Sequence, residues 1–367
     1  MKYNWQQPDW PEFTFDLGQI DDTLFTFANE TGHISGMLNA MPEDMKMEAI
    51  IDTMVAEAIK TSEIEGEYFS RQDVMSSIRN NLGLNKKPDK IKDKKAAGAG
   101  KLMVDVRDSY SAPLTKEKLC SWHEMIMADS KDIQIGKWRT HTEPMQVVSG
   151  AYGKEKVHFE APPSAKVPKE MDRFIKWFND TAPGGEREIK KAPVRSAIAH
   201  LYFESIHPFE DGNGRIGRAI SEKALSQTSG RPGLLSLSMT IEADKKSYYQ
   251  ALENGQRNNN ITKWIKYFAE TTLLAQKQAS QLIDFILKKA KFFDHFKGHI
   301  NDRQLKTIKR MFDAGPAGFE SGMNANKYMS ITKTSKATAT RDLQHLAEMK
   351  AFITQGGGRS TSYHLNL

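Results

Sequence analysis

The sequence predicts a mainly α-helical protein with one central β-hairpin and a winged helix-turn-helix at its C-terminal end. Three observations carry this prediction. Apolar residues recur at helical spacing through most of the chain, and they alternate in a hairpin pattern at 145–164. Residues from about 300 onward have the pattern of three helices followed by a hairpin, with the alternation Tyr363, Leu365 and Leu367 at its end. With 367 residues the chain has room for two or three domains, which we place at 1–95, 96–290 and 291–367.

The composition is that of an ordinary soluble globular chain. Hydrophobic residues make up 39% and charged residues 27%, and no stretch approaches the roughly 18 apolar residues of a membrane span. The N-terminus has no apolar secretion signal, so we expect a cytoplasmic protein without a membrane partner. The single cysteine, Cys120, permits no internal disulfide and lies in a segment with the pattern of a helix face.

The first 95 residues combine an aromatic strap with a helix. Tryptophans and phenylalanines interleaved with prolines at 5–15 indicate an irregular segment that packs against another part of the protein. Apolar residues then recur with helical spacing over 43–60, and the preceding "MPED" supplies a proline and acids at the start. The lysine-rich run "NKKPDKIKDKK" at 85–95 predicts a solvated loop at the first domain boundary.

The central region is predicted to form helices around one hairpin. The stretch "MQVVSGAYGKEKVHFEAPPS" at 145–164 has alternating apolar residues on the far side of a glycine-containing turn. A helix is predicted for "APVRSAIAHLYFESI" at 192–206, and another from Ile216 to Leu225 that "SGRPG" terminates. The stretch "HPFEDGNGRIGR" at 207–218 therefore joins two core helices.

This joining stretch has the residue types of a phosphate site. Pro208, Gly212 and Gly214 prevent a continuous helix, so the stretch begins as a loop. The glycines let the backbone approach a ligand closely, and the first N–H groups of the following helix can point at an anion. Arg215 and Arg218 are three residues apart and share one helix face, which suits a polyphosphate.

An acid and an imidazole complete the predicted site. Asp211 at the edge of a phosphate site can hold Mg²⁺, which prefers one or two carboxylates together with phosphate oxygens. The imidazole of His207 can take a proton from an attacking hydroxyl at neutral pH. An alternative makes His200, His207 and Asp211 the ligands of a metal ion. That alternative lacks an evident further ligand and leaves the glycines and arginines unexplained.

The stretch at 207–218 resembles the signature of the Fic family, HPFxDGNGRxxR, at every defined position, and the likeness extends over about 100–290. The resemblance implies a helical fold with a hairpin flap, and transfer of AMP from ATP to a Ser, Thr or Tyr hydroxyl of a protein. It implies the following roles: general base, His207; Mg²⁺ ligand, Asp211; anion hole, Gly212, Asn213 and Gly214; phosphate contacts, Arg215 and Arg218.

Two further segments resemble parts of that family. The stretch "VHFEAPP" is similar to its flap, which implies that Val157, His158 and Phe159 dock an extended segment of the target by strand pairing. The stretch "SYYQALENGQ" resembles the segment that covers adenine, which makes Tyr249 and Gln256 candidates for that contact. A core tyrosine and a glutamine at a helix end would have the same sequence pattern.

A second motif precedes the central region. In "TSEIEGEY", residues Thr61, Glu65 and Gly66 match [S/T]xxxE[G/N], the inhibitory motif of one Fic class. The resemblance implies that Glu65 pairs with Arg218, so that ATP binds in an orientation unsuited to attack. Gly66 is equally typical of a simple helix C-terminus.

The last fifth of the chain suggests a different function. Residues 301–367 hold ten Lys or Arg against five Asp or Glu, which is most of the net charge of +6. A DNA-binding regulator with a nucleotide-sensing Fic-like domain is therefore the alternative, although winged helices also dock proteins. The candidate DNA contacts are Lys336, Thr338, Thr340, Arg341, Gln344, His345 and, in the wing, Arg359.

The chemistry of the central region also leaves alternatives open. Some Fic relatives remove AMP or transfer other phosphate-containing groups, and an anion hole recognises the phosphate rather than what is attached to it. The partners we expect are ATP, a protein target with a hydroxyl side chain, the chain itself as a second target, and a homodimer that controls access to Glu65.

Overall fold

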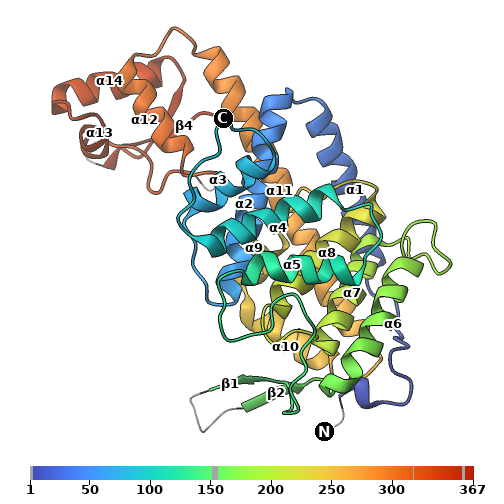
Figure 1. Cartoon of the computed structure of the whole chain (residues 1–367). Coiled ribbons are helices and arrows are strands. Elements are labelled where there is room, and N and C mark those ends of the chain that lie inside the picture. Colours follow the sequence, from blue (N-terminus) through green and yellow to red (C-terminus); the bar gives the residue numbers. More distant parts are fainter. Residues whose placement is uncertain (1–2, 151–155, 317, 358–359) are drawn as a thin grey trace. The chain divides into compact units, whose positions relative to one another are not determined.

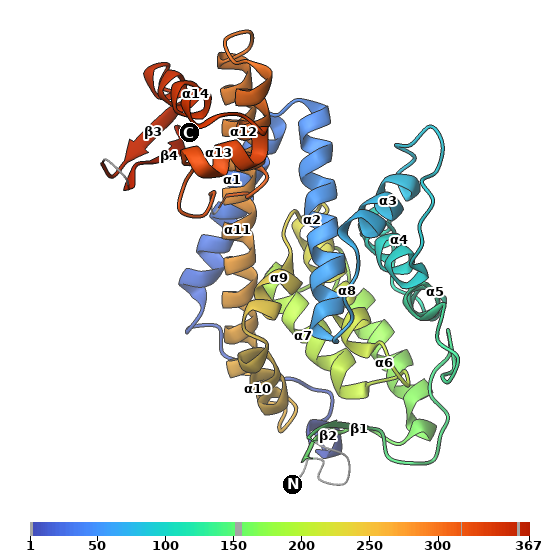
Figure 2. The same ribbon diagram turned by 90° about the vertical axis from the view of Figure 1, so that its left-hand side faces the viewer.

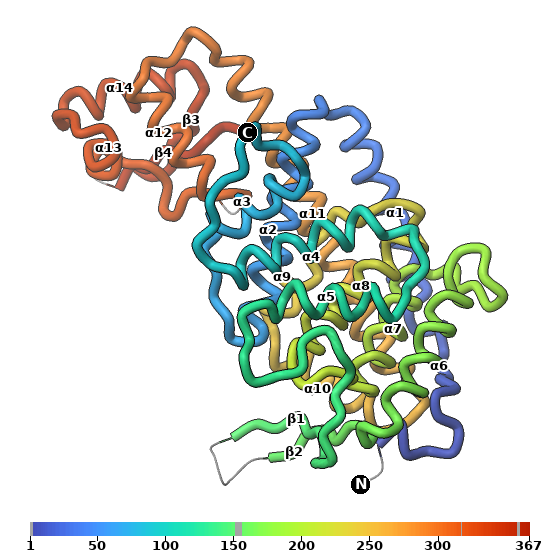
Figure 3. Tube along the Cα trace, viewed as in Figure 1, coloured from blue at the N-terminus to red at the C-terminus, as the bar shows by residue number. Residues whose placement is uncertain are grey.

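The computed structural model describes residues 3–150, 156–316, 318–357 and 360–367 (Figure 3). It confirms a mainly helical protein: the described residues form fourteen α-helices and two β-hairpins. The chain divides into two compact units, the first made of residues 1–32 and 50–279 and the second of residues 33–49 and 280–367. Among the described residues, no helix is long and apolar enough to cross a membrane.

The first unit contains the central region of the sequence. Three of its helices, α1 (Asp21–Asn39), α2 (Glu43–Ile64) and α11 (Thr262–His295), also contribute residues to the second unit. Its other elements are η1 (Asn4–Gln6), α3 (Arg71–Asn81), α4 (Lys94–Asp108), α5 (Lys116–Met127), β1 (Gln146–Ser149), β2 (Lys156–Glu160), η2 (Ser164–Lys166), α6 (Val167–Asp180), α7 (Ala192–Ile206), α8 (Asn213–Ser229), α9 (Leu237–Ala243) and α10 (Lys245–Gly255).

Helices α7 and α8 form the centre of this unit, and α4, α5 and α6 pack around them (Figures 1 and 2). Every residue of α7 is buried, which explains why it is apolar on nearly all sides. Its one arginine, Arg195, is stabilised by hydrogen bonds to the carbonyl oxygens of Phe178 and Ala224, at 2.7 and 3.1 Å. The loop at 207–218 is thereby attached to the most buried part of the unit.

Glycines follow two of the predicted helices. Helix α2 continues to Ile64, beyond the predicted end, and Gly66 follows it with a positive φ of 81°. Helix α8 ends at Gly230, whose φ of 72° is in the left-handed region that favours glycine. Residues 85–93 form no helix or strand, as predicted for the lysine-rich loop, and they lie within the first unit.

The central hairpin is antiparallel. Val147 pairs with Phe159 and Val148 with Val157, so the register shifts by one residue between the two pairs. Phe159 is buried, whereas Val148 and Val157 are exposed. Residues 151–155 at the tip of the predicted hairpin lie outside the described residues.

The N-terminal strap packs where the sequence predicts contact with another part of the chain. The Asn4 amide donates a hydrogen bond of 2.8 Å to Ser205 Oγ on α7, and its backbone N–H donates to the Gln256 carbonyl. The Trp5 indole N–H donates to the carbonyl of Glu160 at the end of β2. The strap therefore connects the hairpin to the end of α7.

The second unit has its own hydrophobic core. Its further elements are α12 (Asp302–Phe312), α13 (Ala325–Thr332), α14 (Lys336–Glu348), β3 (Phe352–Gln355) and β4 (Ser362–Leu365). Aromatic residues from the end of α11 pack against apolar residues of α12, α13, α14 and β3. The predicted order of three helices followed by an antiparallel strand pair is present. The winged-helix assignment itself stays a prediction, and Arg359 of the wing lies outside the described residues.

Candidate active site

The loop between α7 and α8 is held in a conformation that two left-handed residues allow. His207 ends α7 with φ 51° and ψ 61°, and Gly212 precedes α8 with φ 77°. Between them the Phe209 ring is buried, and the Asn213 side-chain amide both accepts from the Phe209 N–H (2.9 Å) and donates to the Phe209 carbonyl (2.8 Å). The Asn213 side chain therefore fixes the loop conformation through hydrogen bonds within the loop itself.

Two buried side chains from outside the signature also hold this loop. Arg139 donates from Nε to the His207 carbonyl at 2.8 Å, and burial lowers the pKa of its guanidinium to about 10. His123 on α5 stacks on Phe209 and lies 3.1 Å from the Asp211 carbonyl. Burial lowers the pKa of His123 to about 4, so the ring is neutral and its Nε2–H donates to Asp211. The sequence analysis identified neither residue.

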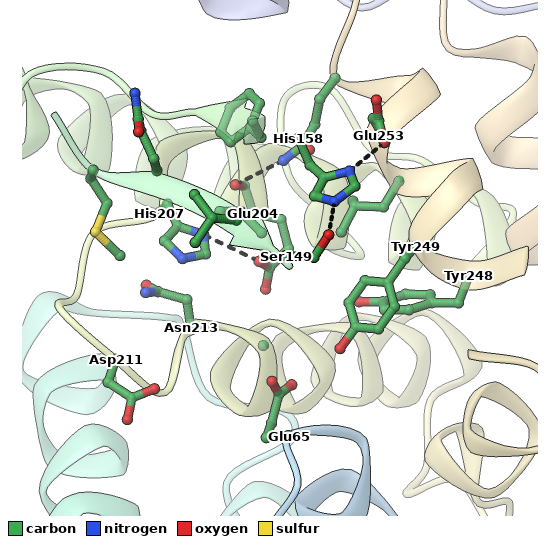
Figure 4. Close-up of a pocket in the computed structure, with 18 of the residues that line it drawn as sticks. Glu65, Ser149, His158, Glu204, His207, Asp211, Asn213, Tyr248, Tyr249 and Glu253 are labelled. Carbon is green, nitrogen blue, oxygen red and sulfur yellow. Dashed lines mark hydrogen bonds and ion pairs between the residues drawn. The ribbon is translucent and has the colours of Figure 1, made fainter. Parts of the chain in front are cut away.

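The loop borders a cavity of about 760 Å³ (Figure 4). The cavity lies between the hairpin, the end of α7, the start of α8, and α10. Most of the predicted site residues line it: Glu65, His158, Phe159, His207, Asp211, Gly212, Asn213, Gly214, Arg218, Tyr249 and Gln256. The structure thus brings together residues from four separate parts of the sequence.

His207 borders this cavity with a nearly buried ring, 14% exposed. One turn earlier on α7, Glu204 places Oε2 3.4 Å from His207 Nδ1, and its side chain is 5% exposed. Burial acts to raise the pKa of the Glu204 carboxyl, but the His207 contact and nearby positive charge outweigh it and hold that pKa below its ordinary value. Glu204 was not among the predicted site residues, because α7 also contains an arginine, a histidine and two serines and a further polar residue there does not indicate a site.

The start of α8 has the properties of an anion site. No side chain caps this helix, so its first N–H groups are left for another partner. Arg218 and Arg215 are both buried on the first turns. The side chains of Glu65 and Arg218 lie close to the Gly214 backbone. A Cβ at this position would lie 2.2 Å from Glu65 Oε1 and 3.1 Å from Arg218 Nη1, so it would collide with the carboxylate.

Glu65 occupies the space next to Gly214 and pairs with Arg218. Its Oε1 accepts a hydrogen bond of 2.6 Å from Arg218 Nη2. Thr61 of the same motif holds the guanidinium as well, because its Oγ1 accepts from Arg218 Nε at 2.7 Å and its carbonyl accepts from Nη2 at 2.9 Å. Burial acts to lower the pKa of Arg218, but the charge of Glu65 raises it above its ordinary value. Gly66 directly follows Glu65 in the left-handed conformation, with φ 81°.

A second acid from the same segment pairs with the other arginine. Glu67 accepts a hydrogen bond from Arg215 Nη1 and also pairs with Lys95 Nζ at 2.6 Å. Both motif arginines are therefore bound to carboxylates that follow α2. Glu67 was assigned no role from the sequence, because directly after the motif it has the pattern of any surface acid.

Asp211 has the exposure and chemistry of a metal ligand at the cavity edge. One carboxylate oxygen, Oδ1, accepts from the Gly212 N–H at 2.6 Å. The described residues make no other hydrogen bond to this carboxylate, so its second oxygen is available to a cation. No group of three or more His, Cys, Asp or Glu side chains in the described chain is arranged to hold a metal ion, which speaks against the alternative site of His200, His207 and Asp211. The His200 ring instead lies 2.7 Å from the Tyr248 hydroxyl.

The hairpin and α10 close the other side of the cavity. The His158 ring contacts Glu253 Oε2 on α10 at 2.9 Å and Ser149 Oγ at 2.6 Å (Figure 4). Of the two predicted adenine contacts, Tyr249 is partly exposed, and burial followed by the charge of Glu65 raises its pKa to about 12. Gln256 is buried and donates its side-chain amide to the Glu204 carbonyl at 3.1 Å. That hydrogen bond gives Gln256 a structural role.

Two family models match the chain. Residues 3–84 match a domain of unknown function, DUF4172, and residues 113–225 match the Fic/DOC family. The second match covers α5 to α8 with the loop between α7 and α8, and the first covers α2 with Thr61 and Glu65.

Solved structures share the fold at low sequence identity. A Fic family protein from Desulfovibrio desulfuricans G20 superimposes with a TM-score of 0.54 over 97% of this chain and 98% of its own, at 18% identity. A Fic domain containing signaling protein from Bacteroides thetaiotaomicron gives a TM-score of 0.53 over 71% of this chain and 97% of its own, at 14% identity. At these identities the likeness establishes a common fold.

Curated relatives match over shorter segments. Protein adenylyltransferase Fic of Nematostella vectensis is 24% identical over 162 residues, which is 44% of this chain and 33% of the relative. A probable protein adenylyltransferase of Aquifex aeolicus is 32% identical over 98 residues, or 27% of each chain. The matched segments thus span about a third or less of these relatives. Residues 113–225 thus match the Fic/DOC family, and the chain shares its fold with solved Fic proteins.

Proposed function

We propose that this protein transfers AMP from ATP to a Ser, Thr or Tyr hydroxyl of a protein. The observation that carries the proposal is the convergence on one cavity of the His207 imidazole, the uncapped start of α8 and the Arg218 guanidinium. A base, a set of N–H donors and a fixed positive charge are what a phosphoryl-type transfer requires, because positioning and charge stabilisation provide most of its catalysis. Relatives named protein adenylyltransferases support the same reaction.

In the proposed reaction the target hydroxyl attacks the α-phosphorus of ATP. His207 accepts the hydroxyl proton, a new oxygen–phosphorus bond forms, and the bond to pyrophosphate breaks. The N–H groups at Gly212, Asn213 and Gly214 stabilise the phosphate oxygens, and Arg215 and Arg218 bind the remaining phosphates. Asp211 would hold Mg²⁺, which supplies neutralising charge to the phosphates.

The contact between Glu65 and Arg218 provides a brake on this reaction. Arg218 has its Nε and Nη2 donors committed to Thr61 and Glu65, so ATP phosphates must compete with a carboxylate for it. The carboxylate also occupies the space beside Gly214 at the start of α8, where an anion would bind. With Glu65 in place, ATP is held in an orientation that does not favour attack.

The hairpin is the proposed docking element for the target. Each of its two strands pairs only with the other among the described residues, so each strand has an outer edge to which a further strand could pair. Phe159 anchors β2 in the core, while Val157 is exposed and His158 borders the cavity. An extended segment of the target paired to such an edge would pass the cavity that contains His207.

Mass spectrometry tests the proposed function directly. Wild-type, Glu65→Gly and His207→Ala proteins are incubated with ATP and Mg²⁺, alone and with cell lysate, and adducts are located by peptide mapping. We expect an AMP adduct on a hydroxyl side chain that increases in Glu65→Gly and is absent in His207→Ala. Glu63→Gly is the matched control, because Glu63 lies in the same segment but pairs with Lys60.

Other outcomes separate the remaining candidates. An adduct on the chain itself makes it its own target, and loss of AMP from an adenylylated protein indicates the reverse reaction. An adduct of another mass indicates transfer of a different phosphate-containing group. A dimer whose dissociation raises the rate would support control of Glu65 by self-association. Absence of all adducts despite ATP binding would contradict the transferase.

The second unit supports DNA binding as a second candidate function. Lys336, Arg341, Gln344 and His345 on α14 are exposed, while Ala339 and Leu343 of the same helix are buried. This places basic and amide side chains together on the outer face of the helix. A fluorescence titration with duplex DNA tests it: affinity should fall on Arg341→Ala and depend on sequence. Equal affinity for all duplexes, unchanged by Arg341→Ala, would contradict it.

A further inference from the structure

Glu204 is a buried acid one helical turn before the proposed base. Its Oε2 lies 3.4 Å from His207 Nδ1, and Figure 4 shows the two side chains facing each other at the cavity. Burying a carboxylate is unfavourable unless it is paired, so its presence in a fully buried helix calls for a specific partner. His207 is that partner.

Helix α8 leaves space for this acid. A Cβ at Gly217 would lie 2.3 Å from Glu204 Oε1 and 3.2 Å from His200 Nδ1, so any other residue at 217 would collide with the carboxylate. His200 is itself buried, and burial lowers its pKa, so it faces Glu204 as a neutral ring. The glycine, the acid and the two imidazoles therefore form one closely packed group inside the unit.

The position of Glu204 bears on which nitrogen of His207 carries the proton. A neutral imidazole has one N–H donor and one acceptor nitrogen, and a carboxylate can only accept. In the described chain, His207 Nδ1 and Glu204 Oε1 have no hydrogen-bonding partner. At 3.4 Å the contact between Nδ1 and Oε2 is long, as hydrogen bonds of catalytic groups often are before the substrate binds.

We propose that Glu204 is a positioning residue that keeps His207 protonated on Nδ1, so that Nε2 is the atom that accepts the proton of the target hydroxyl. This inference rests on the proposed role of His207 as the base. In the transfer the O–H bond breaks, its proton moves to Nε2, and the oxygen electron pair forms the bond to phosphorus as pyrophosphate leaves. Nδ1 keeps its own proton, and the ionised Glu204 stabilises the imidazolium.

Other charged groups surround the pair and must be kept constant in any test. Arg139 contacts the His207 carbonyl from one side. The positive charge of Arg218 on α8 acts on Glu204, and Asp211 and Glu210 lie in the loop that follows His207. Substitution of Glu204 alone leaves all four in place.

NMR of the wild-type protein tests the tautomer without any turnover. With ¹⁵N-histidine labelling, His207 is assigned among the ten histidines by comparison with His207→Ala. We expect the neutral ring to show a protonated Nδ1 and an unprotonated Nε2. In Glu204→Gln the form protonated on Nδ1 should no longer be the predominant neutral tautomer of His207. A wild-type ring protonated on Nε2 would overturn the proposal, and this readout needs no variant of Glu204.

Kinetics in the Glu65→Gly background provide the second readout. Glu204→Gln should lower kcat by about 100-fold, the scale of general-base catalysis, and leave the KM for ATP unchanged. The acid limb of the pH–rate profile should move to lower pH, because the imidazolium loses its neighbouring negative charge. Glu222→Gln on α8 is the matched control, which should change neither the profile nor the tautomer. An unaltered kcat and profile in a folded Glu204→Gln protein would contradict the inference.

The two readouts also separate this inference from the proposed function. Suppose that Glu65→Gly shows no AMP transfer, but the wild-type His207 ring is protonated on Nδ1 and Glu204→Gln abolishes that preference. Glu204 then positions His207, and only the proposed AMP transfer is contradicted. If transfer occurs and the tautomer is wrong, Glu204 does not position the base.

Discussion

The carboxylate of Glu65 lies 2.6 Å from the guanidinium of Arg218, in space that the absence of a side chain at Gly214 leaves open. The Arg218 side chain is 1% exposed and that of Glu65 is 30% exposed. The arginine is therefore a fixed part of the core, whereas the acid approaches from the solvent side. A buried charge with an exposed partner is suited to exchange that partner for another anion.

Glu65→Gln should give a rate of AMP transfer between those of wild type and Glu65→Gly. The amide can still accept a hydrogen bond from Arg218 but has lost the charge that competes with phosphate. Initial rates of AMP incorporation at fixed ATP measure the effect. Equal rates for Glu65→Gln and wild type would show that the negative charge of Glu65 is not what keeps Arg218 from binding ATP.

Glu67→Gln in the Glu65→Gly background should lower the KM for ATP. Glu67, whose side chain is 23% exposed, pairs with the buried Arg215. Because water still reaches the carboxylate, we expect the pair to contribute about 1 kcal/mol, which corresponds to a change of about two- to fivefold. The matched control is Glu63→Gln, because Glu63 pairs with Lys60 rather than with a motif arginine. A KM that rises instead would mean that Glu67 orients Arg215 for ATP.

His123 should make the protein less stable in acid. Burial holds its pKa at about 4, below the ordinary 6.5, so the unfolded state binds its proton first as the pH falls. The stabilisation is complete above pH 6.5 and is lost between pH 6.5 and 4, by about 2 to 3 kcal/mol. Urea unfolding at pH 7 and 4.5 should show a smaller acid loss in His123→Gln than in wild type. His141→Gln, in the loop before β1, should keep the wild-type loss.

Glu222 should make the protein less stable as the pH rises, the opposite of the effect of His123. Burial, followed by the charge of Glu57, raises its pKa from 4.5 to about 8, so the folded state keeps a proton that the unfolded state releases. Stability is therefore lost as the pH rises from 4.5 through 8. Glu222→Gln should be more stable than wild type at pH 8, on the order of 1 to 3 kcal/mol, and the two should converge near pH 4. Parallel melting curves at every pH would contradict this.

Local sequence patterns predicted the elements that frame the site. Helical spacing identified α7 and α8, and glycines and a proline identified the loop between them, because periodicity and backbone freedom act over a few residues. The same reasoning placed the hairpin and the order of elements in the second unit. It predicted that α2 ends near Lys60, one turn early, because Thr61, Ser62 and Glu63 are polar. In the structure Thr61 is buried and holds Arg218.

Contacts between distant segments had no such local pattern. Arg139 and His123 support the loop at 207–218 from elsewhere in the chain, and Glu67 meets Arg215 across 148 residues of sequence. Whether a charged residue is exposed or buried depends on what packs against it, which residue spacing does not encode. Glu204 is the clearest case.

The order of residues along the chain thus predicted the helices, the chemistry of the loop and the acid that follows α2, because each depends on near neighbours. The family resemblance had already implied that this acid pairs with Arg218; the folded molecule added the place of its carboxylate beside Gly214 and the space for Glu204 beside Gly217. Both depend on how closely two helices approach, and that distance is set by the packing of the whole unit.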